Sequence, residues 1–225
     1  MKRFYSQVSV VEDAIRLDGR PVRTPARASL VLPNFALAQV VAEEWRAQGD
    51  EIDPRTMKLT GLANAAIDRV APDPDAFAQP LAAYAEADLL CYRADAPAEL
   101  AAEEAAEWDP LLAWARDRYD VAFAVTNGIV HVAQPPDTVA RLRQALLARD
   151  VFALAAMQPL VTIGGSLVVA LAMAEGRIGA EQAFDATHLD ELWQVRQWGE
   201  DDLAAQAREG RRRDFLAAAR FLALL

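Results

Sequence analysis

The chain has 225 residues and a formal net charge of −10. This acidity argues against a phosphate-binding surface, so we expect no nucleic-acid partner. One cysteine and two histidines exclude an internal disulfide and a cysteine-built zinc site, and the longest apolar run, Leu167–Ala174, is too short for membrane insertion.

Residues 1–60 are expected to form a small N-terminal β-rich domain with one helix. Alternating apolar residues and Pro or Gly turn signals predict short strands. A helix is expected to follow, with Asn34 as its N-cap and Gly49 just after its end. The expected strands are 4–11, 14–17, 21–25 and 30–32, with a turn at Asp18-Gly19, and the expected helix is 35–48.

Residues 61–225 are expected to form a larger, mainly helical domain with one inserted β-hairpin. The 48 alanines of the chain favour helix, because alanine loses no side-chain entropy there. Asn127-Gly128 predicts a type I′ turn between strands at 121–126 and 130–132. Leu89–Tyr92 looks strand-like, and Asp109-Pro110 looks like the start of a helix. The other expected helices are 60–70 (capped by Thr60), 76–90, 99–108, 111–119, 136–150, 151–157, 160–174, 180–198 and 201–225. The predicted fold class is therefore α+β.

Few residues suggest catalysis. Gly164-Gly165-Ser166 resembles half of a nucleophile elbow, but Val168 stands where the last glycine belongs. A serine hydrolase would also need His131 or His188 as its base. The glycines are better explained by a close approach of two helices, and Cys91 between Leu90 and Tyr92 by a buried, inert thiol. A hydrolase that uses Ser166 stays one alternative.

The segment Asp190–Asp202 combines acids with two tryptophans. At 100° per residue, Trp193 and Trp198 are about 140° apart, so one narrow buried stripe cannot hold both. Glu191, Gln194 and Trp198 are expected to share a helix face. Two interpretations remain open: a solvated acidic helix whose tryptophans pack on neighbours, or a contact face for a protein partner.

Many short stretches along the chain match the motifs of one known family, in the same order. They are Lys2-Arg3-Phe4-Tyr5, Leu17–Val22, Thr24-Pro25, Glu44-Trp45, Ile52–Met57, Leu59-Thr60, Leu62-Ala63, Ala66-Ile67-Asp68, Asp88–Arg93, Trp108–Leu112, Gly165–Leu167, and Gln194 with Trp198-Gly199. Together they resemble the assembly chaperones for the α subunit of the ATP synthase F1 head. The resemblance covers nearly the whole chain.

The resemblance implies a function without catalysis or cofactor. Such proteins bind the unassembled α subunit and shield its subunit interface from aggregation until the β subunit replaces them. Because the chain starts almost directly at Phe4-Tyr5, without a transit peptide, it resembles a bacterial, cytoplasmic member, whereas its mitochondrial relatives are found in the matrix. A general adaptor for apolar segments is a further alternative.

The resemblance also points to site residues. In the family, an acidic residue just before the glutamine–tryptophan–glycine signature is linked to function, and Glu191 is the first candidate for it, with Asp190 second. The expected partner-binding residues are Glu191, Asp190, Gln194, Trp198 and Trp193.

Overall fold

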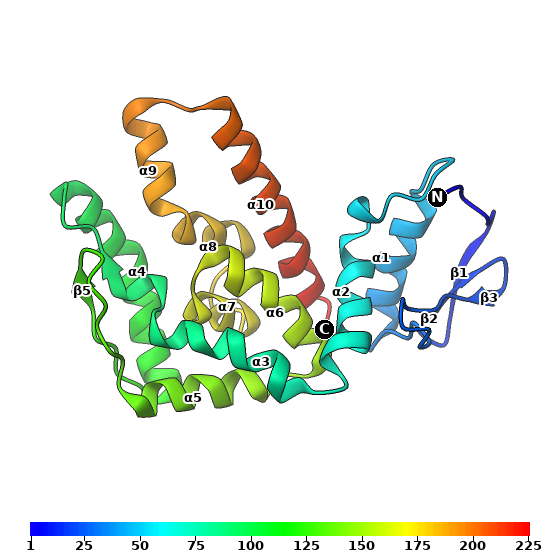
Figure 1. Ribbon diagram of the computed structural model, residues 1–225, viewed down its shortest axis with the longest axis horizontal. Coiled ribbons are helices and arrows are strands. Elements are labelled where there is room, and N and C mark those ends of the chain that lie inside the picture. Colours follow the sequence, from blue (N-terminus) through cyan, green and yellow to red (C-terminus); the bar gives the residue numbers. More distant parts are fainter.

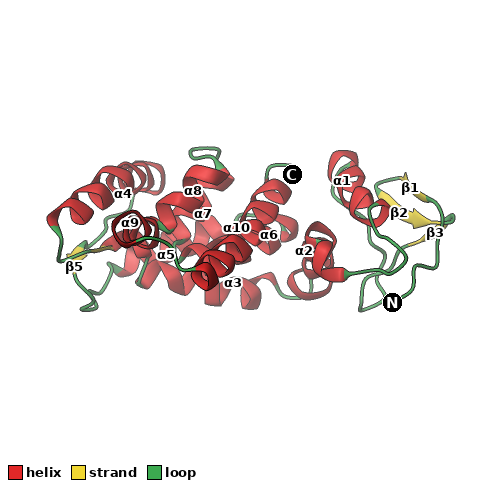
Figure 2. Cartoon of the chain, turned by 90° about the horizontal axis from the view of Figure 1, so that it is seen from above, coloured by secondary structure: helices red, strands yellow, loops and turns green.

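A computed structural model describes residues 1–225. The molecule is elongated, with a small strand-containing module at one end and a larger helical body at the other (Figure 1, Figure 2). The predicted α+β fold class is confirmed.

The N-terminal module begins with a three-stranded antiparallel sheet in the order β1-β2-β3. Residues Glu12 and Asp13, and then Asp18 and Gly19, have positive φ angles, as two-residue type I′ turns require. The expected turn at Asp18-Gly19 is confirmed. The strand predicted over 14–17 is confirmed, the one predicted over 4–11 is shorter, and 21–25 and 30–32 contribute little beyond isolated bridges. The strands are β1 (Val8–Val11), β2 (Ala14–Leu17) and β3 (Arg20–Pro21).

Helix α1 (Phe35–Arg46) packs on this sheet, and α2 (Lys58–Ala65) follows. The side chain of Asn34 accepts the Leu37 N–H at 2.8 Å, which confirms the predicted N-cap. The expected cap at Thr60 is wrong. The Glu44 carboxylate instead accepts the N–H groups of Leu59 and Thr60, so a residue of α1 caps α2.

A turn of π-helix (Ala66–Val70) extends α2, and α3 (Pro74–Ala82) starts after Asp73. The predicted helix 76–90 is therefore too long. Short 3₁₀ segments at Ala83–Glu86 and Leu89–Cys91 replace its second half, and the strand expected at 89–92 shrinks to β4 (Tyr92–Arg93).

Helix α4 (Ala98–Tyr119) is one helix, not the two that were predicted on either side of Pro110. Trp108, Leu111 and Leu112 form a buried face that continues past the proline, and this packing outweighs the lost backbone hydrogen bond. Asp109 does not cap a helix; its carboxylate pairs with Arg93 at 2.6 Å.

The predicted β-hairpin around Asn127-Gly128 does not form, because no strand covers 130–132. Only Gly128 has a positive φ, so the turn is not type I′, and β5 (Thr126–Asn127) pairs in parallel with β4. The two arms are linked by a side chain: the Gln134 amide accepts the Ala124 N–H at 3.0 Å and donates to the Ala124 carbonyl at 2.8 Å.

Six further helices complete the body. The helix break predicted near Pro159 is absent and lies at Gly165 instead, where φ is +68°. The helix predicted over 180–198 is divided at His188. The helices are α5 (Pro136–Leu147), α6 (Val151–Gly164), α7 (Leu167–Ala174), α8 (Ala180–Thr187), α9 (Leu189–Trp198) and α10 (Asp202–Leu222).

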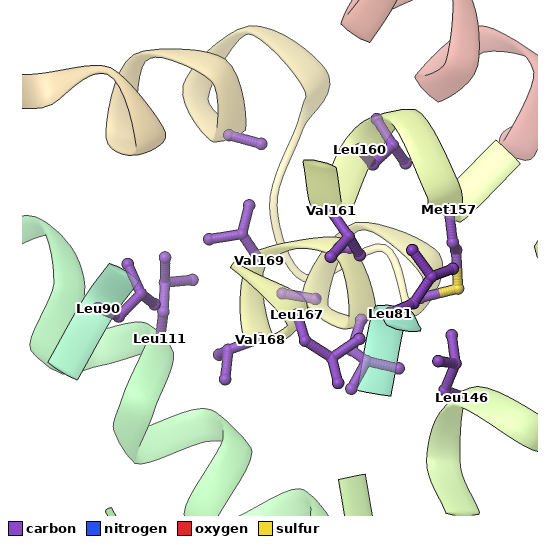
Figure 3. Packing of buried hydrophobic residues seen from close by; sticks show 14 of the residues in the cluster. Leu81, Leu90, Leu111, Leu146, Met157, Leu160, Val161, Leu167, Val168 and Val169 are labelled. Carbon is purple, nitrogen blue, oxygen red and sulfur yellow. The ribbon is translucent and has the colours of Figure 1, made fainter. Parts of the chain in front are cut away.

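The main hydrophobic core surrounds α6 and α7. Residues 167–172 of α7 are all buried, and side chains from α3, α4, α5, α8 and α10 pack around the pair. Figure 3 shows Leu81, Leu111 and Leu146 beside these two helices. A second apolar cluster lies under the N-terminal sheet and also includes Ala156 of α6 and Phe221 of α10. The domain boundary after residue 60 stays a prediction, since α2 spans it. None of the helices has both the length and the apolar character to cross a membrane.

Candidate functional site

Helix α9 and the first half of α10 form a hairpin that projects from the helical body (Figure 1). In α9 only Leu189 is buried, and the buried residues of α10 begin at Phe215. The hairpin therefore lacks the apolar packing that fixes the rest of the body.

Ion pairs join the two helices of the hairpin. The Glu191 carboxylate lies 3.2 Å from a guanidinium nitrogen of Arg208 and 2.5 Å from one of Arg211. Arg208 also pairs with Glu200 in the connection. The side chain of Arg208 is 13% exposed and that of Glu191 is 34% exposed, so water screens these pairs only in part. Glu191 thus connects α9 to α10 in this structure.

His188 separates α8 from α9. Its ring stacks on Phe184 at 3.9 Å between centroids, and its Nδ1 lies 3.0 Å from the Phe184 carbonyl oxygen. Burial lowers the pKa of His188, and the nearby positive charge of Arg211 lowers it further. A neutral, fixed imidazole therefore marks the base of the hairpin.

The connection between α9 and α10 begins at Gly199. Its φ of +88° and ψ of 176° lie in a region that essentially only glycine populates. Asp201 then caps α10 by accepting the Ala204 N–H at 2.9 Å. These two residues end one helix and start the next within a few residues.

Two large apolar side chains are exposed near this connection. Trp198 is 75% exposed and Leu203 is 77% exposed. Trp198 touches Trp193 edge to face, with 5.7 Å between ring centroids, and Trp193 packs against the main core. An aromatic ring rimmed by charged groups is typical of an interface anchor.

The predicted site residues all lie on α9, but their side chains make separate contacts. The Gln194 side chain donates to the Asp190 carboxylate at 3.1 Å, Trp198 contacts Trp193, and Glu191 contacts α10. Glu191 and Trp198 are seven residues apart, so they lie on the same face of α9. They are nevertheless separated by about 10.5 Å along the helix axis and do not need to touch.

Ser166 is fully buried and has a structural role. Its Oγ accepts the Val169 N–H at 3.0 Å and so caps α7. The neighbouring Asp88 carboxylate accepts the Val168 N–H at 3.0 Å. Burial raises the pKa of Asp88 to about 6, although these hydrogen bonds oppose the rise. The hydrolase alternative therefore loses its nucleophile.

The other two side chains considered for catalysis are an exposed histidine, His131, and a buried cysteine, Cys91. His131 is exposed and its Nδ1 lies 3.1 Å from the Tyr92 hydroxyl. Cys91 is buried, and that burial raises its pKa to about 12, as expected for an inert thiol. No group of three or more His, Cys, Asp or Glu side chains is arranged to hold a metal ion.

Arg208, Glu200 and Leu203 were not among the predicted site residues. Three arginines follow one another at 211–213 in the sequence, and the structure places Arg211 and Arg212 in ion pairs with Glu191 and Glu181. The available signal was charge of opposite sign on two helices joined by a glycine-containing connection.

Comparisons with known proteins agree with one another. The sequence model of the family described as "ATP12 chaperone protein" matches residues 2–116. The mitochondrial protein atp12 of Schizosaccharomyces pombe is 26% identical over 200 residues, which cover 84% of this chain and 69% of that protein.

Solved structures extend the similarity over the hairpin. Atp12 from Paracoccus denitrificans is 40% identical, with a TM-score of 0.92 over 99% of this chain and 97% of that one. An aspartate-to-lysine mutant of the same protein gives a TM-score of 0.93. A protein described as a candidate chaperone from Agrobacterium tumefaciens is 39% identical, with a TM-score of 0.92 over 99% of this chain and 85% of that one.

Proposed function

Because this chain belongs to the ATP12 chaperone family, we propose that it binds the unassembled α subunit of the ATP synthase F1 head and shields its subunit interface until the β subunit replaces it. In general terms, the chain is an ATP12-type assembly chaperone for ATP synthase. The binding of the α subunit in particular is supported by the sequence resemblance described above.

The exposed end of the α9–α10 hairpin is the observation that carries this proposal. A chaperone for a subunit interface must offer apolar surface to an apolar client surface, and Trp198 and Leu203 provide it. Charged residues around them, such as Glu200 and Asp201, form a polar rim. Such a surface suits a partner that another subunit later displaces.

Within this proposal the predicted site residues take different roles. Trp198 contacts the client directly, and Trp193 supports its ring from the core side. Asp190 and Gln194 are exposed and lie on the outer side of α9. Glu191 acts through Arg208 and Arg211 by holding α9 and α10 at a fixed separation, so it is a positioning residue.

The test is co-expression of this chain with the ATP synthase α and β subunits of its own organism, followed by affinity purification. We expect α without β in the purified complex, and soluble α only when this chain is present. Aggregation of α regardless of this chain would overturn the proposal. Equal recovery of unrelated apolar proteins would favour the general adaptor.

A further inference from the structure

A second surface of the helical body lies apart from the hairpin connection. It is an open groove of about 670 Å³ between α4 on one side and α8 and α9 on the other. Ala186 and Leu189 form its floor and are nearly fully buried, while Leu192 and Val195 of α9 are half-buried along its wall. The bottom of the groove is therefore apolar and is formed by α8 and α9.

The rim of the groove is acidic. Glu103 and Glu107 lie one turn apart on α4, and Asp185 lies opposite them on α8. The only cation in the lining is Arg196, whose guanidinium pairs with Glu103 at 2.6 Å. Glu107 and Asp185 are exposed and have no ion-pair partner. Two uncompensated carboxylates thus face each other across an apolar floor.

The acidic character extends beneath the rim. Burial raises the pKa of Glu104, the neighbour of Glu103 on α4; the Ala94 N–H and the charge of Arg93 oppose the rise, and the negative charge of Asp190 on α9 adds to it. Carboxylates of α4 and α9 therefore lie close enough to interact. A free anion or a second copy of this acidic chain would be repelled here.

We propose that this groove binds an amphipathic segment of the client, with apolar side chains on the floor and Lys or Arg side chains against Glu107 and Asp185. The inference rests on the proposed function, because it takes the unassembled α subunit as the client. Charge complementarity argues for a basic segment, and an apolar floor between two helices suits a helix laid lengthwise.

The test uses a charge-reversed double variant, Glu107→Arg with Asp185→Arg. Both side chains are exposed and unpaired, and an arginine near the C-terminal end of α8 is favoured by the helix dipole, so folding is retained. The matched control, Glu12→Arg with Asp117→Arg, makes the same change in net charge at exposed, unpaired acids away from the groove. Both are compared with the wild-type protein for capture of the co-expressed α subunit.

We expect the groove variant to bind α roughly tenfold more weakly than the control variant does. A photo-cross-linking residue in place of Val195 should label a segment of α with apolar residues and a net positive charge. Equal capture by both double variants, or labelling of an acidic segment, would overturn the groove while the capture of α itself still stands. If wild-type protein captures no α, both the proposed function and this inference are wrong.

Discussion

The α6–α7 junction and the α9–α10 junction are both short breaks between helices; each contains a glycine with positive φ, and at each a carboxylate accepts an N–H of the following helix. At the first junction, Gly165 and Ser166 are surrounded by the core, and the buried carboxylate of Asp88 accepts the Val168 N–H. At the second, Gly199 and Asp201 are exposed, and the helices are joined by the ion pairs of Glu191.

Because of this difference, the two junctions have different structural roles. A buried hydrogen bond with no competing water keeps one geometry, because breaking it leaves an unsatisfied group. A partly exposed ion pair contributes little to stability and can open at low cost. The core therefore defines the fold, whereas the separation of α9 and α10 depends on ion pairs that add little to global stability.

The sharpest test of the core is Leu171→Ala. Leu171 is fully buried on α7, so its truncation leaves a cavity and should lower the free energy of unfolding by about 2–5 kcal/mol. Urea unfolding followed by circular dichroism measures this. Leu203→Ala on the hairpin is the matched control and should change stability by less than about 0.5 kcal/mol. Similar losses in both variants would contradict the division between core and hairpin.

The buried junction should also respond to pH through Asp88. Its folded pKa of about 6 lies above the ordinary value of 3.8, so the folded state holds this proton to higher pH than the unfolded state does. The protonation of Asp88 therefore contributes fully to the free energy of unfolding below about pH 3.8. This contribution is lost as the pH rises through about 6, and the total change is about 3 kcal/mol.

Asp88→Asn removes this titration. The unfolding free energy of the wild type minus that of the variant should fall by about 2.4 kcal/mol between pH 4 and pH 7. Urea unfolding at several pH values measures it, and other carboxylates cancel in the difference. A difference that is constant with pH would show that Asp88 is not desolvated at the junction.

The sequence predicted the elements whose signals are local. The Asn34 cap and the Asp18-Gly19 turn need only neighbouring residues, and both are present. Pro110 and Asn127-Gly128 led to wrong predictions because contacts with other parts of the chain determine the structure there: the buried face of α4 continues past the proline, and Gln134 bridges the arms of the loop. Tertiary packing overrode local preference at these positions.

The sequence suggested which residues of α9 to consider for the candidate site, but not how their side chains are arranged. The spacing placed Glu191 and Trp198 on one face of α9, yet it could not show that Arg208 and Arg211 would take up the carboxylate of Glu191. That contact depends on the angle between two helices, which a single helical period does not contain. The groove beside α4 depends on residues up to 93 positions apart for the same reason.

The hairpin itself is tested by comparing Glu191→Gln with the double variant Arg208→Gln and Arg211→Gln. Both remove the ion pairs of Glu191, and the double variant also removes the pair of Arg208 with Glu200. Both should therefore speed amide hydrogen exchange in α9 roughly fivefold and weaken capture of α, the double variant at least as much as Glu191→Gln. Global stability should change by about 1 kcal/mol or less. If only Glu191→Gln weakens capture, Glu191 contacts the client directly and is not a positioning residue.

The smallest effect on stability is expected at the end of the hairpin, where the effect on binding should be large. Trp198→Ser removes a ring that is 75% exposed, so the free energy of unfolding should change by less than about 0.5 kcal/mol. An aromatic anchor at an interface is worth about 2 kcal/mol or more, so capture of α should fall at least about thirtyfold. Trp193→Ser is the informative counterpart, because that ring packs on the core and its loss should cost stability as well. Trp198→Ser protein that captures α as well as wild type would move the client away from the hairpin and leave the α4–α9 groove as the remaining surface for it.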